Sequence, residues 1–254
     1  MDTSRKSPTL STLNVHRSCN HACLRVLVVG TGTEIGKTHV TSCLLAQARA
    51  QGRSVRGYKP IATGIDHLCE DAQLHAEALG APYLHPSFAY RRPVSPHLAA
   101  REEERPIDLD VVRRRSDELA QGCDAVVIEG AGGLFTPLGD TFTNIALVRC
   151  LMPAAVVLVA PDRLGVLHDV GACVTAARAC GIEFSALVLS APGAPDASTG
   201  SNARELERVG MPAVVGVFPR AKWDAKESQD IAAQVWQALR ALPATKVSTN
   251  THES

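Results

Sequence analysis

Short apolar runs alternate with segments of helical periodicity along most of the chain. The runs are rich in Val and Leu and are bounded by Gly, Pro or Asp, which is the pattern of strands buried on both faces. They predict strands at residues 25–30, 124–129, 155–160, 183–190 and 213–218, and helices between them near 37–51, 70–80, 108–121, 166–180, 201–209 and 227–241.

This alternation predicts an α/β fold with a single doubly wound parallel sheet, helices on both faces and right-handed crossovers. In such sheets, ligands bind at the carboxyl ends of the strands. We expect one domain over residues 24–242, a disordered polar extension over 1–23 and a flexible tail over 243–254. The Pro- and His-rich stretch 82–107 is expected to be an excursion from the domain rather than a linker.

Charge and hydropathy narrow the class of partner. The 254 residues carry 26 basic and 26 acidic side chains, so the overall charge favours neither nucleic acid nor an anionic membrane. No apolar run reaches the roughly 18 to 20 residues that span a bilayer. The first residues also lack the apolar core of a signal peptide. We therefore expect a cytoplasmic protein whose partner is a small molecule.

The eight cysteines are too dispersed for a disulfide scaffold, and we expect most of them to be reduced and buried. Four possible metal ligands, His16, Cys19, His21 and Cys23, cluster near the N-terminus. Their spacing fits no common zinc site well, and the polar segment around them has no periodicity. These features favour a disordered leader over a metal site.

A glycine- and threonine-rich turn follows the first apolar run, and Gly36, Lys37 and Thr38 then open a helical pattern. In this arrangement backbone N–H groups and the positive end of the helix face a phosphate, the lysine reaches the outer phosphates, and the threonine hydroxyl can ligate Mg²⁺. The spacing is a variant, because Thr31 stands where the usual P-loop has glycine. The alternative is a strand, turn and helix without a nucleotide, but the next two segments favour a fold of the P-loop NTPase type.

Two charged residues stand at predicted strand ends. Glu129 follows four apolar residues and precedes glycines, so its carboxylate can complete a Mg²⁺ site; a turn or capping carboxylate is the alternative. Lys59, fixed by Pro60 after the expected second strand, can stabilise negative charge in phosphoryl transfer. An ordinary surface lysine is the alternative there, so this position is informative only together with the P-loop.

These segments resemble the dethiobiotin synthetase family over roughly residues 24–240. The block at 129–143, Glu-Gly-Ala-Gly-Gly-Leu-Phe-Thr-Pro-Leu-Gly-Asp-Thr-Phe-Thr, is specific enough to make chance agreement implausible. The other matching segments are Gly-Thr-Glu-Ile-Gly-Lys-Thr at 32–38, Gly-Tyr-Lys-Pro-Ile-Ala-Thr-Gly at 57–64, Ser-Pro-His at 95–97, Arg-Pro-Ile at 105–107, Leu-Gly at 164–165, and Pro219.

The resemblance implies an ATP-dependent carboxylation and ring closure in biotin synthesis. In that reaction, 7,8-diaminopelargonate takes up CO₂ as a carbamate, which ATP converts to a carbamic-phosphoric anhydride. The neighbouring amine then displaces phosphate to give dethiobiotin and ADP. The resemblance also implies Mg²⁺ as cofactor and a homodimer with a shared active site.

Residue roles follow from the resemblance. Lys37 would contact the phosphates and the carbamate, Lys59 would stabilise the transferring phosphoryl group, and Thr38, Asp71 and Glu129 would hold Mg²⁺. The nucleotide site would also include Thr33, Glu34, Ile35, Gly36, His39, Gly130, Ala131, Gly132, Ser190, Ala191 and Pro219. The substrate would meet Thr63 and, through its carboxylate, a helix N-terminus of a second subunit formed by Leu164, Gly165, Val166 and Leu167.

The chain departs from the family pattern at two site positions. Ser190 stands where the family often has an asparagine that reads adenine, which predicts weakened selectivity for the base. His168 replaces an asparagine in the carboxylate-binding helix. Two other classes stay open: a partitioning or cell-division ATPase, in which a lysine rather than Gly32 is expected, and an amidoligase domain, for which no nucleophile motif is recognisable.

Overall fold

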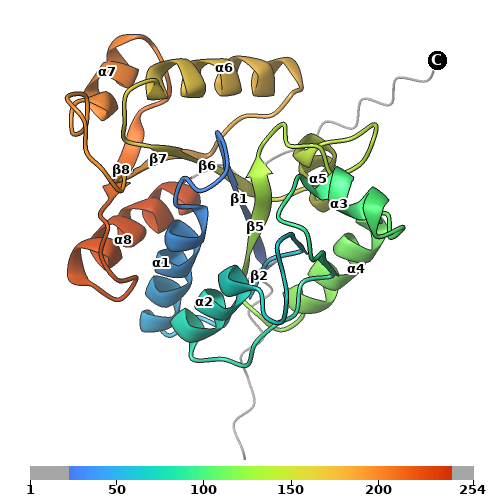
Figure 1. The fold of residues 1–254 in the computed structure, drawn as a ribbon. Helices are drawn as coiled ribbons and strands as arrows, with labels where there is room; N and C mark the ends of the chain where they lie inside the picture. Colours follow the sequence, from blue (N-terminus) through green and yellow to red (C-terminus); the bar gives the residue numbers. More distant parts are fainter. Residues whose placement is uncertain (1–22, 242–254) are drawn as a thin grey trace, which may run out of the picture.

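The computed structural model describes residues 23–241 and has a six-stranded parallel sheet at its centre. The strand order is β2-β5-β1-β6-β7-β8, so successive strands are placed on both sides of β1 (Figure 1). This confirms the predicted doubly wound α/β fold. The strands are β1 (Leu24–Gly30), β2 (Val55–Tyr58), β5 (Ala125–Gly133), β6 (Ala155–Pro161), β7 (Ala186–Ser190) and β8 (Val214–Phe218).

Helices cover both faces of this sheet (Figure 1). One face packs against α1 (Lys37–Ala50), α2 (Glu70–Leu79) and α8 (Lys226–Arg240). The other face packs against α3 (Pro96–Glu102), α4 (Leu109–Ala120), α5 (Asn144–Leu151), α6 (Val166–Ala179) and α7 (Asn202–Arg208).

The continuous apolar runs reflect burial on both faces. In β1, Val26 and Val28 belong to the core under α1 and α8, whereas Leu27 and Val29 belong to the opposite core. All four are at most 1% exposed. Because successive side chains of a strand point to opposite faces, a strand covered on both sides has no position for a polar residue.

The predicted strand at 183–190 is wrong at its start, because β7 begins only at Ala186. Two short helices, α3 and α5, escaped prediction, whereas the equally short α7 was predicted. Each nevertheless has a start signal: Pro96 occupies the first turn of α3, and the Thr143 side chain accepts a hydrogen bond from Ile145 N at the start of α5.

The stretch 82–107 packs onto the domain. It contributes β4 (Phe88–Ala89), which pairs in parallel with β3 (Ile61–Ala62), and it contains α3. Phe88, Tyr90 and Ile107 are buried in the same core as α4 and α5.

Seven cysteines fall within the described residues, and all are free. Cys43, Cys69, Cys123 and Cys173 are buried as predicted, whereas Cys150 and Cys180 are half-buried. Cys23 lies with its Sγ atom 3.3 Å from that of Cys123. The other three members of the N-terminal cluster, His16, Cys19 and His21, lie outside the described residues, as do almost all of the expected extension and the expected tail. No helix in residues 23–241 has the length and apolarity to cross a membrane.

Candidate active site

The turn between β1 and α1 depends on two glycines, at positions where neighbouring side chains leave no room for a Cβ atom. Gly36, at the start of α1, has a φ of 93°, and a Cβ atom there would lie 2.2 Å from Ser190 Oγ. Only glycine satisfies both constraints. At the other end of the turn, the Ile35 side chain packs over Gly30, where a Cβ atom would lie 2.4 Å from Ile35 Cδ1. Lys37 is buried and donates a hydrogen bond of 2.9 Å to Gly32 O.

The end of β5 runs close beside this turn. A Cβ atom on Gly133 would lie 3.2 Å from Gly30 O and from Gly32 N, so the glycines after Glu129 allow the two backbones to approach. The side chain of Asn144, which is fully buried, donates hydrogen bonds of 2.7 Å to Ala131 O and Gly133 O. This amide fixes the end of β5 to the start of α5.

A cluster of charged and polar side chains lies just after β2, in the middle of β5 and at the starts of α1 and α2. The predicted strand at 124–129 is too short, because β5 continues through the glycines to Gly133. Lys59 Nζ is 2.7 Å from both Glu129 Oε1 and Asp71 Oδ2. The Thr38 hydroxyl is 2.5 Å from Asp71 Oδ1 and 3.0 Å from Glu129 Oε1, and His75 Nε2 is 2.9 Å from Glu129 Oε2. The cluster joins residues up to 91 positions apart in the sequence.

Burial sharpens the electrostatics of this cluster. Glu129 is 1% exposed and Lys59 6%, which excludes a surface lysine and a turn carboxylate at these positions. Burial alone would raise the pKa of Glu129, but the Lys59 charge and the hydrogen bond from His75 outweigh it and hold that pKa well below its ordinary value. Burial likewise opposes the charge of Lys59, but Glu129 and Asp71 keep its pKa above the usual range.

Lys37 has a different balance. Burial lowers its pKa to about 8, and the nearby Lys59 charge acts in the same direction, while Glu129 and Asp71 offset part of the effect. Lys37 therefore loses its proton at a pH only slightly above neutral.

Three oxygen-bearing side chains in this cluster could hold a hard cation. The carboxylates of Asp71 and Glu129 both lie within hydrogen-bond distance of the Thr38 hydroxyl. Oxygen ligands of this kind suit Mg²⁺, which is usually held by one or two carboxylates together with substrate phosphates. The donor set therefore fits Mg²⁺.

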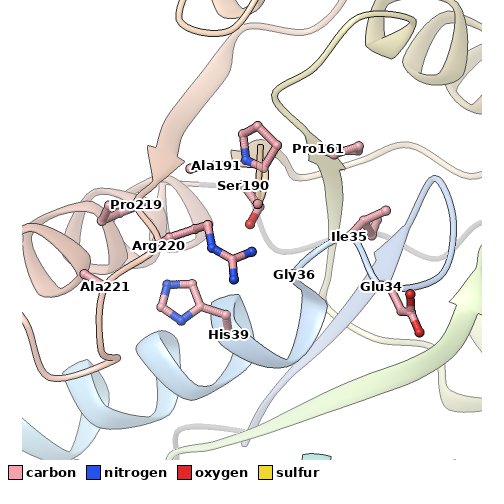
Figure 2. A pocket seen from close by; sticks show the side chains of 12 residues that line it. Glu34, Ile35, Gly36, His39, Pro161, Ser190, Ala191, Pro219, Arg220 and Ala221 are labelled. Atoms are coloured by element: carbon pink, nitrogen blue, oxygen red, sulfur yellow. The ribbon is translucent and has the colours of Figure 1, made fainter. Parts of the chain in front are cut away.

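A pocket of about 340 Å³ opens beside the turn, at the ends of β7 and β8 (Figure 2). It brings together seven of the residues expected at the nucleotide site: Glu34, Ile35, Gly36, His39, Ser190, Ala191 and Pro219. Glu34 stands in the left-handed region with a φ of 57°. The Ser190 side chain lies against Gly36, which limits its reach into the pocket.

The expected substrate residues do not join this cluster through hydrogen bonds in the described part of the chain. Thr63 follows β3 and is half-buried. The segment 164–167 begins α6, with Leu164 73% and Leu167 38% exposed, and Leu164 N donates to Asp196 Oδ2 at 2.8 Å. Exposed leucines at a helix start are consistent with a surface that a second copy of the chain would cover.

Three site residues escaped sequence reasoning: His75, Asn144 and Arg220. His75 lies four residues after Asp71, which puts both on one face of α2, so helical spacing offers a signal once Asp71 is suspected. Asn144 follows the capping residue Thr143, and this cap signal locates its helix but not its contacts. Arg220 lines the pocket next to Pro219, and no sequence pattern marks it.

Comparison with known proteins shows which family the chain belongs to. An ATP-dependent dethiobiotin synthetase of Rhodococcus erythropolis is 36% identical over 222 residues, which are 85% of this chain and 97% of the relative. Its counterpart in Caulobacter vibrioides is 37% identical over 81% of this chain and 97% of the relative. The chain belongs to the dethiobiotin synthetase family. Its members are ligases, and the broader AAA domain family matches residues 24–225.

Solved structures relate this dethiobiotin synthetase family member to P-loop NTPases. The septum site-determining protein MinD of Pyrococcus horikoshii, complexed with Mg-ADP, has a TM-score of 0.54 and 15% identity, covering 85% of this chain and 95% of its own. MinD in the MinC:MinD complex of Aquifex aeolicus has a TM-score of 0.53 and 12% identity, covering 88% and 99%. At these identities the likeness shows the fold, which confirms the P-loop NTPase type.

The first prediction concerns the stability that depends on the buried cluster. Glu129→Gln should lower the free energy of unfolding at pH 7 by about 3 to 5 kcal/mol, because it leaves the buried Lys59 charge with one carboxylate fewer. Urea denaturation measures this change. Glu118→Gln, which alters an exposed carboxylate on α4, should change stability by less than about 0.5 kcal/mol.

The stability difference between wild type and Glu129→Gln should also depend on pH. The Glu129 pKa is depressed in the folded protein, so its contribution is complete above the unfolded value of 4.5 and is lost as the pH falls towards the folded value. The stability difference between wild type and Glu129→Gln should therefore shrink below pH 4.5. A difference that stays constant down to pH 3 would contradict the assigned electrostatics.

Proposed function

We propose that this chain catalyses the ATP-dependent carboxylation and ring closure of 7,8-diaminopelargonate, giving dethiobiotin, ADP and phosphate in the cytoplasm. The observation that carries the proposal is the buried contact of Lys59 with Asp71 and Glu129 beside the P-loop. This contact sets lysines and carboxylates next to a phosphate cradle. The two relatives compared above are named for this reaction product.

Positioning and electrostatics account for the proposed chemistry. CO₂ reacts spontaneously with an unprotonated amine, so the enzyme must hold the resulting carbamate and deliver the γ-phosphoryl group of ATP in line to its oxygen. This gives the carbamic-phosphoric anhydride. The neighbouring amine then attacks its carbonyl carbon and releases phosphate. No residue is required as a covalent nucleophile.

The P-loop lysine and the strand-end lysine divide this task. Lys37 stands at the start of α1, where its ammonium, the backbone N–H groups and the helix end all attract phosphate oxygens. Lys59 is anchored by two carboxylates and points its charge at the same region. We assign Lys37 to the phosphates and the carbamate and Lys59 to the transferring phosphoryl group.

Mg²⁺ is the proposed cofactor, and Thr38, Asp71 and Glu129 are its proposed ligands. When bound, the ion neutralises charge on the nucleotide phosphates. The Thr38 hydroxyl contacts both carboxylates, which keeps the three oxygens together at the mouth of the P-loop.

We further propose a homodimer with a shared active site. Thr63 would contact the diamine part of the substrate, and residues 164–167 of a second subunit would bind its carboxylate at the start of α6. The exposure of Leu164 and Leu167 supports this role. Gly165, with a φ of 93°, directly precedes the helix. Leu164 N and Val166 N already donate to Asp196 Oδ2 and Arg163 O, so the anion would be bound by the remaining N–H groups of the first turn. His168, also exposed, would alter how the substrate tail is held.

A partitioning or cell-division ATPase is the second candidate, and the structural likeness to MinD supports it at the level of fold. Sequence identity favours the synthetase, with 36% against 15% or less. Residue 32 also separates the two, because Gly32 stands where the partitioning class is expected to have a lysine. An amidoligase domain has no specific observation in its favour.

Turnover of 7,8-diaminopelargonate with bicarbonate and MgATP tests the proposal directly. Mass spectrometry should detect dethiobiotin in an amount equal to the ADP released. ATP hydrolysis that needs no diamine, or that DNA or vesicles stimulate, would instead support the partitioning class.

Removing either lysine should slow turnover. Lys37→Ala and Lys59→Ala are each expected to reduce kcat/KM by at least about a hundredfold, as when a donor to transition-state charge is lost. Steady-state kinetics on variants that circular dichroism shows to be folded gives the comparison. Lys222→Ala, an exposed lysine after β8, serves as control and should keep wild-type activity. Near wild-type kcat/KM in a folded Lys37→Ala or Lys59→Ala variant would remove the assigned role.

Nucleotide affinity should fall as the pH rises. Since the pKa of Lys37 lies near 8, its ammonium is charged below that pH and neutral above it. Binding of ADP at higher pH must take up a proton, so Kd should increase by up to about tenfold per pH unit above 8. Calorimetric titration from pH 6.5 to 9.5 measures this change in Kd. A Lys37→Met variant should bind ADP weakly, with a Kd that does not change with pH in this way.

Weakening the carboxylate set should raise the Mg²⁺ requirement. Asp71→Asn keeps the shape of the side chain but loses the charge that binds a hard cation, so half-maximal activity should need at least about tenfold more Mg²⁺. Glu129→Gln should act in the same direction, with stability monitored in parallel. Unchanged Mg²⁺ titrations in both variants would refute the ligand assignment.

A further inference from the structure

Arg220 places an unpaired positive charge in the pocket at the ends of β7 and β8. Figure 2 shows its guanidinium directed into the pocket, above the ring of His39. A Cβ atom on Gly193 would lie 3.3 Å from Arg220 Nη1, so the side chain reaches from the end of β8 towards the loop after β7. Arg220 is exposed at the pocket, and none of the ion pairs and hydrogen bonds found within residues 23–241 involves its guanidinium.

The other side chains of the pocket leave the guanidinium as its dominant polar group. Burial lowers the pKa of His39 against the effect of a hydrogen bond to the Pro219 backbone, and the Arg220 charge lowers that pKa further, which disfavours a second positive charge in the pocket. The His39 ring packs edge-on against Phe218. The Ser190 hydroxyl is directed at Gly36. Glu34, the other charged residue of the pocket, lies on the P-loop side, away from Arg220 (Figure 2).

A guanidinium discriminates between bases by its chemistry. It carries five N–H donors and no acceptor, so it cannot pair with the exocyclic amine of adenine. Guanine instead presents two adjacent acceptors, O6 and N7, that match an arginine fork. The pocket opens from the P-loop residues Glu34, Ile35 and Gly36, so a nucleotide whose phosphates lie in the P-loop would direct its base towards Arg220.

We propose that Arg220 is a specificity-determining residue, which admits GTP alongside ATP by donating hydrogen bonds to the carbonyl edge of the base. The inference rests on the proposed nucleotide-dependent function. The phosphate contacts of the P-loop are common to both nucleotides, so ATP is retained as a substrate. The guanidinium supplies the additional contact for guanine.

Nucleotide binding without the diamine gives the cleanest test. Calorimetry should give Kd values for GDP and ADP, with Mg²⁺, that lie within about tenfold of one another in the wild-type chain. Arg220→Ala should weaken GDP binding by about five- to a hundredfold and ADP binding by less than threefold. Arg220→Gln, whose amide both donates and accepts, should shift the preference towards ADP. Lys222→Ala removes a charge two residues away, outside the pocket, and should leave the ratio unchanged.

Three results would overturn the inference: a wild-type preference for ADP above about a hundredfold, equal losses for both nucleotides in Arg220→Ala, which would indicate a ribose or phosphate contact, and unchanged binding of both nucleotides in that variant. The values of kcat/KM for GTP and ATP in ring closure separate this outcome from failure of the proposed function. Nucleotide binding with the predicted ratios but without dethiobiotin formation would sink the function and leave the role of Arg220 supported.

Discussion

The buried contact between Lys59 and Glu129 is the constraint on which the site depends. Two charges removed from water are tolerated only when each has close partners, and here Asp71, His75 and Thr38 supply them. Lys59 directly follows β2 and Glu129 lies in β5. Their partners lie in two helices, Thr38 in α1 and the other two in α2. The contact forms only when β2 pairs with β5, which brings Tyr58 opposite Ile128, one residue before each charge. The ion pair and the strand order are therefore two aspects of one arrangement.

A second constraint is the close approach of two backbones. The turn after β1 and the end of β5 are near enough that side chains at Gly30 and Gly133 would collide with their surroundings. Asn144, at the start of α5, holds the end of β5 through two of its carbonyl groups. The strand end beside the phosphate cradle is thus held by a neutral amide, which adds no charge beside the cluster.

Most of the fold could be predicted from the sequence, because strands that are buried on both faces are continuous apolar runs. The apolar runs of β1, β5 and β6 are examples. Less of the site could be predicted from the sequence. Lys59 and Glu129 follow recognisable apolar runs, whereas Asp71 is expected only from the family resemblance. His75 and Arg220 lie beside their partners only after the sheet is assembled, since periodicity does not specify which strands are neighbours. Their contacts therefore needed the structure.

The site has two parts that depend on different kinds of information. The phosphate side is built from backbone groups and a positive φ at Gly36, so it tolerates little change. The pocket beyond it is lined in part by the ends of β7 and β8 and the loops that follow them, where a residue such as Arg220 takes part in no strand pairing and in no buried ion pair. Selectivity for the base can consequently vary within this fold while the machinery that holds the phosphates and the carbamate stays the same.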